Sequence, residues 1–409
     1  MADFARLREQ EYRQRLEVER LRHSVYEQTD PTATQNLMDQ LIAAENALGL
    51  LEKEREELQA NDKTIREGLL VNTTSVSKLA GQETTGLEAK IELKMAQLPT
   101  AICHLFDPQT NPLVSCSVSN RSIRTRRVRI KSFIENYSAR AIDTAELRHN
   151  ETKVFLQLPT LFPIRARQVT ELTRATLNLL VEDLDNDRVE IHQTTPIWLL
   201  ARTTAPLAVR DPATGKWNDL TKYFGAFVTP NEPELMKFLA APARLRPDGL
   251  VGYQGNQNDG VDAQVEALFT ALKDAKLTYV NSVIAFSPDG GTRNQRVRLP
   301  RESLQFGTAN CIDGTVLFAS LLEGISINPA IVVVPGHAFV GWQVWDKIDK
   351  WEYLETTMIG THTFAQARNS GNSMAQTFQK LAKDTGNDAK FRQWALPELR
   401  TQHRITPME

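Results

Sequence analysis

The chain has 409 residues, of which 41% are hydrophobic and 24% are charged, as is ordinary for a globular protein of two or three domains. Its formal net charge of -2 gives no bulk electrostatic reason to expect nucleic acid or an anionic membrane as a partner. Because no run of about 18 uncharged apolar residues occurs, no membrane-spanning helix is predicted either.

The three cysteines, Cys103, Cys116 and Cys311, form no CxxC pair and have no metal-ligand spacing. An odd number of cysteines, with no apolar secretory segment near the N-terminus, favours a reducing cytoplasm. A Cys103–Cys116 disulfide is the less favoured alternative. The histidines lack ligand spacing and no GxxxxGK[ST] or GxGxxG pattern occurs, so neither a metal nor a nucleotide cofactor is expected.

The sequence of residues 1–98 predicts a helical hairpin or coiled coil. From Leu37 to Leu69 the apolar residues alternate at intervals of four and three, broken only at Arg55 and Asp62. Asp30-Pro31 separates this segment from an earlier helix-forming run, and helical character returns at GLEAKIELKMAQL, before Pro99. The hairpin could pack on itself or on the rest of the chain, or it could serve in dimerisation or partner docking.

The sequence of residues 99–219 predicts an immunoglobulin-like β-sandwich. LTRATLNLLVED within this region fits either a strand or a short helix. The basic run RSIRTRRVRIK is interpreted as one solvated strand face, because Val128 and Ile130 alternate with Arg127 and Arg129. Other segments have alternating apolar residues and fit strands: AICHLFD, LVSCSVSN, RRVRIKSFIENY, AIDTAELRH, TKVFLQLPT and EIHQTTPIWLLART.

The sequence of residues 220–409 predicts a third region, in which helices and strands are mixed. YFGAFVT is expected to be a strand, and SPDGGTRNQ to be the tip of a loop. DGVDAQVEALFTALKDA is expected to be a helix with one apolar stripe, with Asp259 as a candidate N-cap. Residues after 360 are mostly polar and are expected to form helices.

A thiol, an imidazole and a carboxylate follow one another inside this third region. Cys311 begins an apolar helical run that ends at Gly324, and the partial positive charge of a helix N-terminus favours thiolate over thiol. His337 and Glu355 lie on two predicted antiparallel strands, where His337 could act as a base and Glu355 could orient it. On spacing alone, a core thiol, a strand-end histidine and a solvated glutamate remain the alternative.

The stretch GTANCIDGTVLFASLLEGISINPAIVVVPGHAFVGW resembles the core of the transglutaminase-like superfamily of papain-fold cysteine enzymes, in particular its bacterial members. Family members carry the catalytic Cys, His and Asp in that order, which implies these roles for Cys311, His337 and Glu355. A glutamate in the third place departs from the family pattern, and Asp346 and Asp349 are its rivals. The resemblance covers roughly residues 220–409.

Acyl transfer also needs donors for the developing oxyanion. The backbone N–H of Cys311 is the first candidate. Gln305 lies six residues before Cys311, the interval of the oxyanion glutamine in papain-like enzymes, and Asn310 lies directly before it. Both could instead be loop and cap residues. Trp342 and Trp345 could line a cleft or belong to the core.

The expected protein is therefore an α+β chain with an N-terminal helical hairpin, a middle β-sandwich and a C-terminal transglutaminase-like domain. The expected function is that of a thiol hydrolase, in particular a cysteine protease acting on a protein or peptide substrate. Amine transfer onto glutamine and an inactive scaffold are the alternatives. A companion protein in a bacterial multi-component system, or self-association, is expected through the N-terminal helices.

Overall fold

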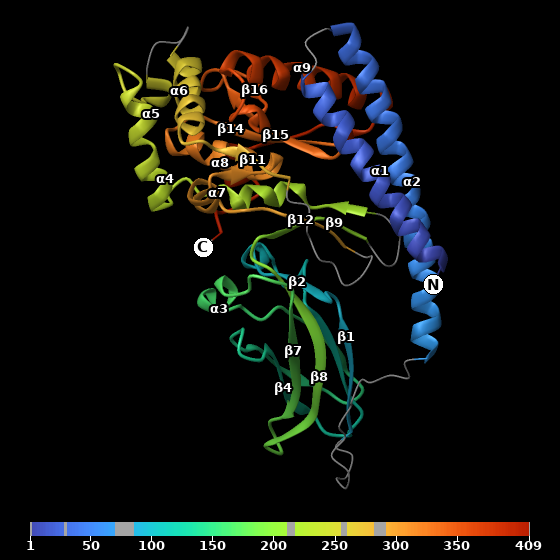
Figure 1. Ribbon diagram of the computed structural model, residues 1–409. Coiled ribbons are helices and arrows are strands. Elements are labelled where there is room, and N and C mark those ends of the chain that lie inside the picture. The colour runs from blue at the N-terminus through green and yellow to red at the C-terminus, as the bar shows by residue number, and fades with distance from the viewer. Residues whose placement is uncertain are drawn as a thin grey trace. The chain divides into compact units, whose positions relative to one another are not determined.

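The computed structural model describes residues 2–27, 31–69, 86–210, 217–254, 260–281 and 292–408. The chain is a mixed α+β protein with several sheets (Figure 1). It divides into two compact units, one containing the described residues up to 69 and the other those from 86 onwards. Across the described ranges, no helix is both long and apolar enough to cross a membrane.

The smaller unit is an antiparallel pair of helices, α1 (Ala2–Glu27) and α2 (Pro31–Leu69). The Gln14 side-chain amide donates to the Ala44 carbonyl at 3.1 Å, which joins the middle of α1 to the first half of α2. The predicted hairpin is therefore present. The described helical side chains that are apolar and buried are Leu7, Val18, Leu21, Val25, Met38, Leu41 and Ala44.

The first part of the larger unit has two sheets around one apolar core. One sheet has the strand order β1-β3-β6 and the other β2-β8-β7-β4-β5. All neighbours are antiparallel except β2 and β8, which are parallel. The bounds are β1 (Leu87–Leu93), β2 (Gln97–Pro99), β3 (Val114–Asn120), β4 (Arg126–Ile134), β5 (Ala141–Leu147), β6 (Thr152–Gln157), α3 (Pro163–Arg167), β7 (Thr173–Asp183) and β8 (Arg188–Leu200).

Two predictions for this part are wrong. GLEAKIELKMAQL is not helical but contains β1 and β2, because its half-buried Leu87, Ala89 and Ile91 alternate with exposed charged residues at the period of a strand. AICHLFD is not a strand but contains a short 3₁₀ turn at Cys103–Leu105. The ambiguous LTRATLNLLVED is strand β7. The sheets therefore begin before the predicted boundary at residue 98.

The rest of the larger unit has a four-stranded antiparallel sheet of order β16-β15-β14-β17, a sheet of order β10-β9-β12 and the parallel pair β11-β13. The strands are β9 (Thr204–Arg210), β10 (Trp217–Asp219), β11 (Thr278–Tyr279), β12 (Thr292–Arg296), β13 (Thr308–Ala309), β14 (Pro329–Val334), β15 (His337–Gln343), β16 (Trp351–Leu354) and β17 (Arg392–Ala395). The helices are α4 (Pro233–Phe238), α5 (Ala240–Arg244), α6 (Gly260–Asp274), α7 (Pro300–Phe306), α8 (Cys311–Gly324), α9 (Phe364–Thr385) and α10 (Leu396–Thr401).

The strands of this part differ from several expectations. Because β9 pairs with β10 and β12, these two early strands join the later elements and not the sheets that precede them. YFGAFVT lies largely in a 3₁₀ helix, Thr221–Phe227, and the second half of SPDGGTRNQ begins strand β12. FRQWA, expected to be helical, contributes β17.

The predicted stripe of α6 is confirmed, since all five of its apolar residues are buried: Val261, Val265, Leu268, Phe269 and Leu272. Its proposed N-cap Asp259, residues 70–85, and the side chains of Arg55 and Asp62 lie outside the described residues.

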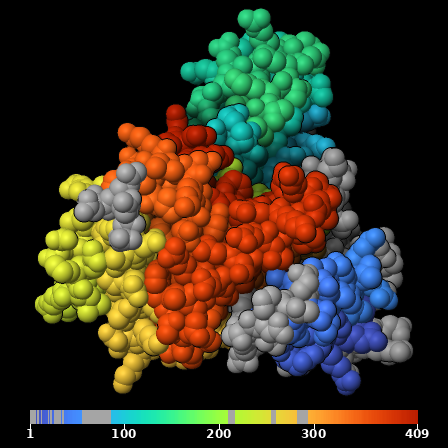
Figure 2. All heavy atoms as spheres, turned by 90° about the horizontal axis from the view of Figure 1, so that it is seen from above, coloured from blue at the N-terminus to red at the C-terminus, as the bar shows by residue number. Residues whose placement is uncertain are grey.

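Helix α8 is the centre of this part. Its side chains are buried from Ile312 to Leu322, as expected for a helix that is hydrophobic all round, and it packs on β14 and β15. Helix α9 packs against β16, where a Cβ on Gly371 would lie 2.7 Å from backbone atoms of Tyr353 and Leu354. On the face shown in Figure 2, the orange and red atoms of these late elements form one continuous packed surface. The fold thus holds the N-terminus of α8 beside the sheet.

Candidate active site

A hydrogen-bonded cap fixes the segment that leads into Cys311. Asn310 is the N-cap of α8, and its side-chain oxygen accepts from the Asp313 N–H at 2.8 Å. The Asp313 carboxylate accepts in return from the Asn310 N–H at 3.2 Å, and also from the Arg298 N–H at 2.7 Å. These reciprocal bonds form a capping box. Cys311 is therefore held in the first position of the helix, where it is half-buried.

Asp313 is a site residue that the sequence analysis missed. Its side chain is fully buried, and burial raises the pKa of its carboxyl, although the N–H groups of Arg298 and Asn310 oppose that rise. The Asn-x-x-Asp spacing of NCID is the signal that could have identified it, since an acidic residue three positions after an Asn is typical of a helix start. Asp313 supports the position of Cys311 without being exposed to a substrate.

His337 is the first residue of β15, directly after the turn that joins β14 to β15. Gly336 has a φ of 70°, a left-handed conformation that favours glycine, and the turn pairs Val334 with His337. The imidazole stacks on the Phe339 ring with a centroid distance of 6.2 Å. Because α8 packs on β15, this end of the strand lies against the helix that carries Cys311.

Glu355 follows the last residue of β16 and is fully buried. Its Oε2 lies 2.7 Å from Nε2 of His337. Its Oε1 accepts from the backbone N–H of Thr357 at 3.0 Å and from the Thr357 hydroxyl at 2.6 Å. Both carboxylate oxygens therefore have partners. The rivals Asp346 and Asp349 are exposed in the connection between β15 and β16, away from this pair.

The electrostatics favour a charged His337 beside a charged Glu355. Burial disfavours the imidazolium, but the Glu355 carboxylate and the hydrogen bonds with Cys311 and Glu355 outweigh it and raise the pKa of His337 from 6.5 to about 10. Burial likewise opposes the charge of Glu355, yet His337 and Thr357 keep the pKa of that carboxyl below its usual value. Since Nε2 contacts Glu355, Nδ1 is the ring nitrogen left for the Cys311 thiol. The structure thus brings the three predicted residues together.

A glycine allows α8 to approach the segment after Glu355. A Cβ on Gly314 would lie 2.9 Å from Oγ1 of Thr356 and 3.1 Å from its Cβ. The same hydroxyl donates to the Cys311 carbonyl at 3.4 Å. Gly314 therefore keeps the thiol-bearing turn and the Glu355 segment in contact.

The two tentative oxyanion residues differ in their surroundings. Gln305 is exposed near the end of α7, whereas Asn310 is buried and acts as the helix cap. Trp342 is a core residue, fully buried, with its indole N–H 3.3 Å from the Asp262 carboxylate. Trp345 is half-buried and packs edge-on against Tyr253.

The other two thiols have apolar surroundings. Burial raises the pKa of Cys103 and the pKa of Cys116 to about 12, and all three cysteines are free thiols. The Cys103–Cys116 disulfide is therefore absent. In the part of the chain that the structure describes, no group of three metal-ligating side chains could hold a metal ion.

No known protein-family model matches the chain, and no curated protein matches it. Among solved structures, the chain is similar to a FixG-related protein from Vibrio parahaemolyticus, at 12% identity and a TM-score of 0.19, over 27% of this chain and 94% of that one. It is also similar to native alpha-2-macroglobulin from Escherichia coli, at 9% identity and a TM-score of 0.21, over 50% of this chain and 36% of that one. Neither TM-score is high enough to assign a fold or a family.

Proposed function

We propose that the protein is a thiol hydrolase, in particular a cysteine protease, with Cys311 as nucleophile, His337 as general base and acid, and Glu355 as the residue that orients His337. The observation that carries the proposal is the buried 2.7 Å contact between His337 and Glu355, with the same imidazole hydrogen-bonded to a thiol at a helix N-terminus. A buried charged pair is costly to keep for stability alone, so this arrangement favours a chemical role.

The reaction proceeds in two halves. His337 is already charged and holds the proton of the Cys311–His337 pair, so the Cys311 sulfur attacks the carbonyl carbon of an amide as the thiolate, forming a C–S bond and an oxyanion. The C–N bond then breaks as His337 gives its proton to the leaving amine. Water attacks the acyl-enzyme with His337 taking its proton, the C–S bond breaks, and the product acid leaves. Glu355 keeps its charge throughout and stabilises the imidazolium.

The oxyanion forms at the N-terminus of α8. The first N–H groups of a helix have no intrahelical acceptor, and the helix dipole favours negative charge there. The Cys311 N–H is the donor we assign to the oxyanion. Asn310 contributes through the cap that orients this N–H, because its side-chain oxygen and its own N–H already hold Asp313.

The same proposal extends to the domains. We assign the sheet and helices around α8 to a transglutaminase-like papain fold, and the two-sheet region before them to an immunoglobulin-like support domain. Helices α1 and α2 are assigned a coiled-coil role in self-association or in docking a companion protein. Their exposed apolar Leu16 and Leu50 support that role.

Cleavage of a mixture of unstructured peptides by the full chain tests the proposed reaction. New peptide termini should appear without any added amine, and Cys311→Ala should lower the rate by at least about 10³-fold. Cys103→Ala is the matched control and should keep full activity. If Cys311→Ala cleaves as fast as the native chain, the proposal is wrong.

An added primary amine separates hydrolysis from crosslinking. Incorporation of the amine into peptide glutamines, with no cleavage and with the same dependence on Cys311, would assign the site to amine transfer. If neither cleavage nor amine incorporation is detected, the inactive-scaffold alternative remains.

A further inference from the structure

The end strand of the four-stranded sheet is held along its outer edge by a helix. In the order β16-β15-β14-β17, β16 is the end strand, and α9 packs against it. The Tyr353 N–H donates to Oδ1 of Asn372 at 2.9 Å, and the Glu355 N–H donates to the Ala367 carbonyl at 3.0 Å. Both acceptors lie on α9. The backbone that carries the Glu355 carboxylate is therefore fixed directly by this helix.

Two side chains of α9 also hold Glu352 in the same strand. The Asn372 amide donates to Oε2 of Glu352, and Nε of Arg368 donates to the same oxygen at 3.1 Å. Burial opposes the charge of Glu352, but these hydrogen bonds and the positive charges of Arg368 and Lys350 lower the pKa of that carboxyl. Glu352 is therefore charged at neutral pH and stays bound to α9.

The same arginine links β16 to β15. Nη1 of Arg368 lies 3.0 Å from Oδ2 of Asp262 in α6, and Oδ1 of Asp262 accepts from the Trp342 indole N–H at 3.3 Å. Trp342 lies on β15 and is opposite Glu352 in the pairing of β15 with β16. These contacts form a closed ring through the two strands that carry the candidate active site.

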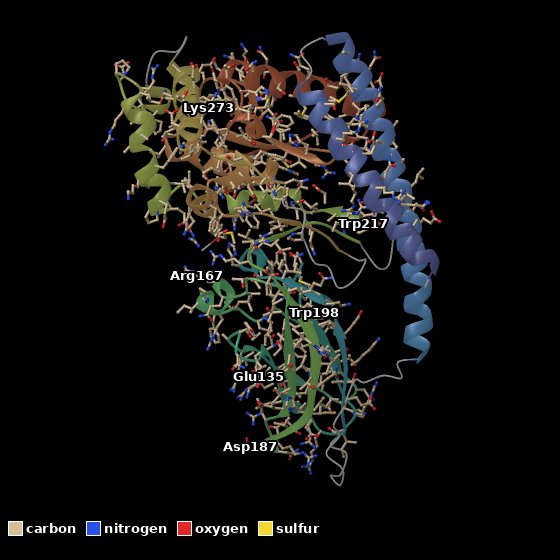
Figure 3. All side chains as sticks on the ribbon, in the orientation of Figure 1. Glu135, Arg167, Asp187, Trp198, Trp217 and Lys273 are labelled. Atoms are coloured by element: carbon tan, nitrogen blue, oxygen red, sulfur yellow. The ribbon has the colours of Figure 1, made fainter. Side chains whose placement is uncertain are left out.

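Helix α9 is itself fixed at its N-terminus. Lys273 of α6, labelled in Figure 3, donates from Nζ to the His362 carbonyl at 2.6 Å, directly before the N-cap residue Thr363. The Thr363 hydroxyl accepts from the Gln366 N–H at 3.3 Å, and the Gln366 side chain accepts from the Thr363 N–H at 3.0 Å, which completes a capping box. The acceptors for the backbone of β16 therefore lie on a helix whose start is fixed.

Stability alone does not account for the charged contacts. The side chains of Arg368, Asp262 and Glu352 are 32%, 35% and 17% exposed, and partly exposed ion pairs contribute little to the free energy of unfolding. Their orientation of β16 has a larger consequence, because the Glu355 carboxylate meets the His337 ring at 2.7 Å. A displacement of about 1 Å in such a group can lower a rate by about 100-fold.

We propose that Arg368 and Asn372 are positioning residues, which act through β16 to hold Glu355 at hydrogen-bonding distance from His337. Their role rests on the orienting role proposed above for Glu355, and it gives α9 a part in the reaction. Neither side chain is assigned a contact with substrate or with the reacting atoms.

Titration of His337 in the full chain, followed by NMR of labelled histidine, tests this role without a substrate. Although burial opposes it, Glu355 and Cys311 raise the pKa of His337 to about 10. In Asn372→Ala and Arg368→Met, a looser contact with Glu355 should lower that pKa by at least about one pH unit. Arg368→Lys keeps a positive charge on α9 and should recover part of the loss.

Steady-state kinetics of peptide cleavage provide the second readout. In Asn372→Ala and Arg368→Met, kcat should fall by about 10–100-fold while KM stays within about twofold of the native value. Phe378→Leu, a change at a buried residue of the same helix, is the matched control. It should lower the melting temperature and leave both kcat and the His337 pKa unchanged. Arg368→Met serves if Asn372→Ala does not fold, because Arg368 is partly exposed.

The positioning role and the hydrolase fail in different ways. A native chain that cleaves no peptide, together with a lowered His337 pKa in the variants, would refute the hydrolase and support the positioning role. Cleavage that depends on Cys311, with kcat and the His337 pKa unchanged in both variants, would overturn the positioning role alone. An equal decrease of that pKa in Phe378→Leu would overturn it as well, because general loosening of α9 would then explain the effect.

Discussion

Cys311 and Cys116 show how much a thiol depends on its surroundings. Cys116 is fully buried in the core between two sheets, where burial raises its pKa to about 12. Cys311 is half-buried at a helix N-terminus and hydrogen-bonds to an imidazole that is itself held by a buried carboxylate. A thiol in an apolar core is expected to be unreactive, whereas polar partners and a helix start suit the nucleophilic role that we propose for Cys311.

The largest effect should come from removing the base. His337→Gln should lower peptide cleavage by at least about 10⁴-fold, because the thiol proton then has no acceptor and the leaving amine no donor. His149→Gln changes an exposed histidine and should have no effect. Comparable losses in both variants would show that the loss of activity is not specific to His337 and would contradict its role as the base.

Glu355→Gln should have the next largest effect, a loss of about 10²–10³-fold, because the amide keeps the shape but not the charge of the carboxylate. The native pH profile of kcat/KM should fall on the alkaline side near the raised His337 pKa of about 10. In Glu355→Gln that fall should move to lower pH, since the charge that raises the pKa is gone. Asp349→Asn, a change at the exposed rival, should leave the profile in place; a shift there would contradict the assignment of Glu355.

The His337–Glu355 pair should also make stability depend on pH. His337 has a pKa of about 10 in the folded chain against the usual 6.5, so its contribution is complete below about 6.5 and is lost as pH rises towards 10. The lowered pKa of Glu355 acts at the other end, and its contribution is lost as the carboxylate becomes protonated in acid.

Urea unfolding at a series of pH values measures this effect. The free energy of unfolding of the native chain should decrease from neutral pH to pH about 10 by a few kcal/mol more than that of His337→Gln. Parallel curves for the two proteins would mean that His337 is not charged in the folded state.

The smallest effect concerns the contact that holds the two halves of the site together. Gly314→Ala should destabilise the chain by about 1–3 kcal/mol, because the new Cβ would meet Thr356 at 2.9 Å. Gly49→Ala, in α2, has open space around it and should instead stabilise its helix by up to about 1 kcal/mol. Equal stabilisation by both substitutions would remove the evidence for a close contact at Gly314.

The sequence predicted the elements beside Cys311, His337 and Glu355 better than it predicted the other strands. The apolar run after Cys311, the turn before His337 and the third strand before Glu355 have strong local signals, and the structure forms α8, β15 and β16 there. The wrong assignment of β1 arose because Leu87, Glu88, Ala89 and Lys90 are also acceptable in a helix, and pairing with β3 decides the outcome.

Long-range pairing explains the other errors. Strand β17 forms because it pairs with β14, more than 50 residues earlier, and β12 forms against β9. The roles of Asp313 and Thr357 depend on hydrogen bonds that only the folded chain reveals, although both residues lie within three positions of a predicted site residue.

The most direct measurement of the central claim is the relative reactivity of the three thiols. The native full chain is treated with a limiting amount of iodoacetamide at neutral pH, and the modified cysteine is identified by peptide mass spectrometry. Cys311 should react at least about 100-fold faster than Cys103 and Cys116, whose thiols have pKa values of about 12. Cys311 reacting no faster than the other two would contradict the account.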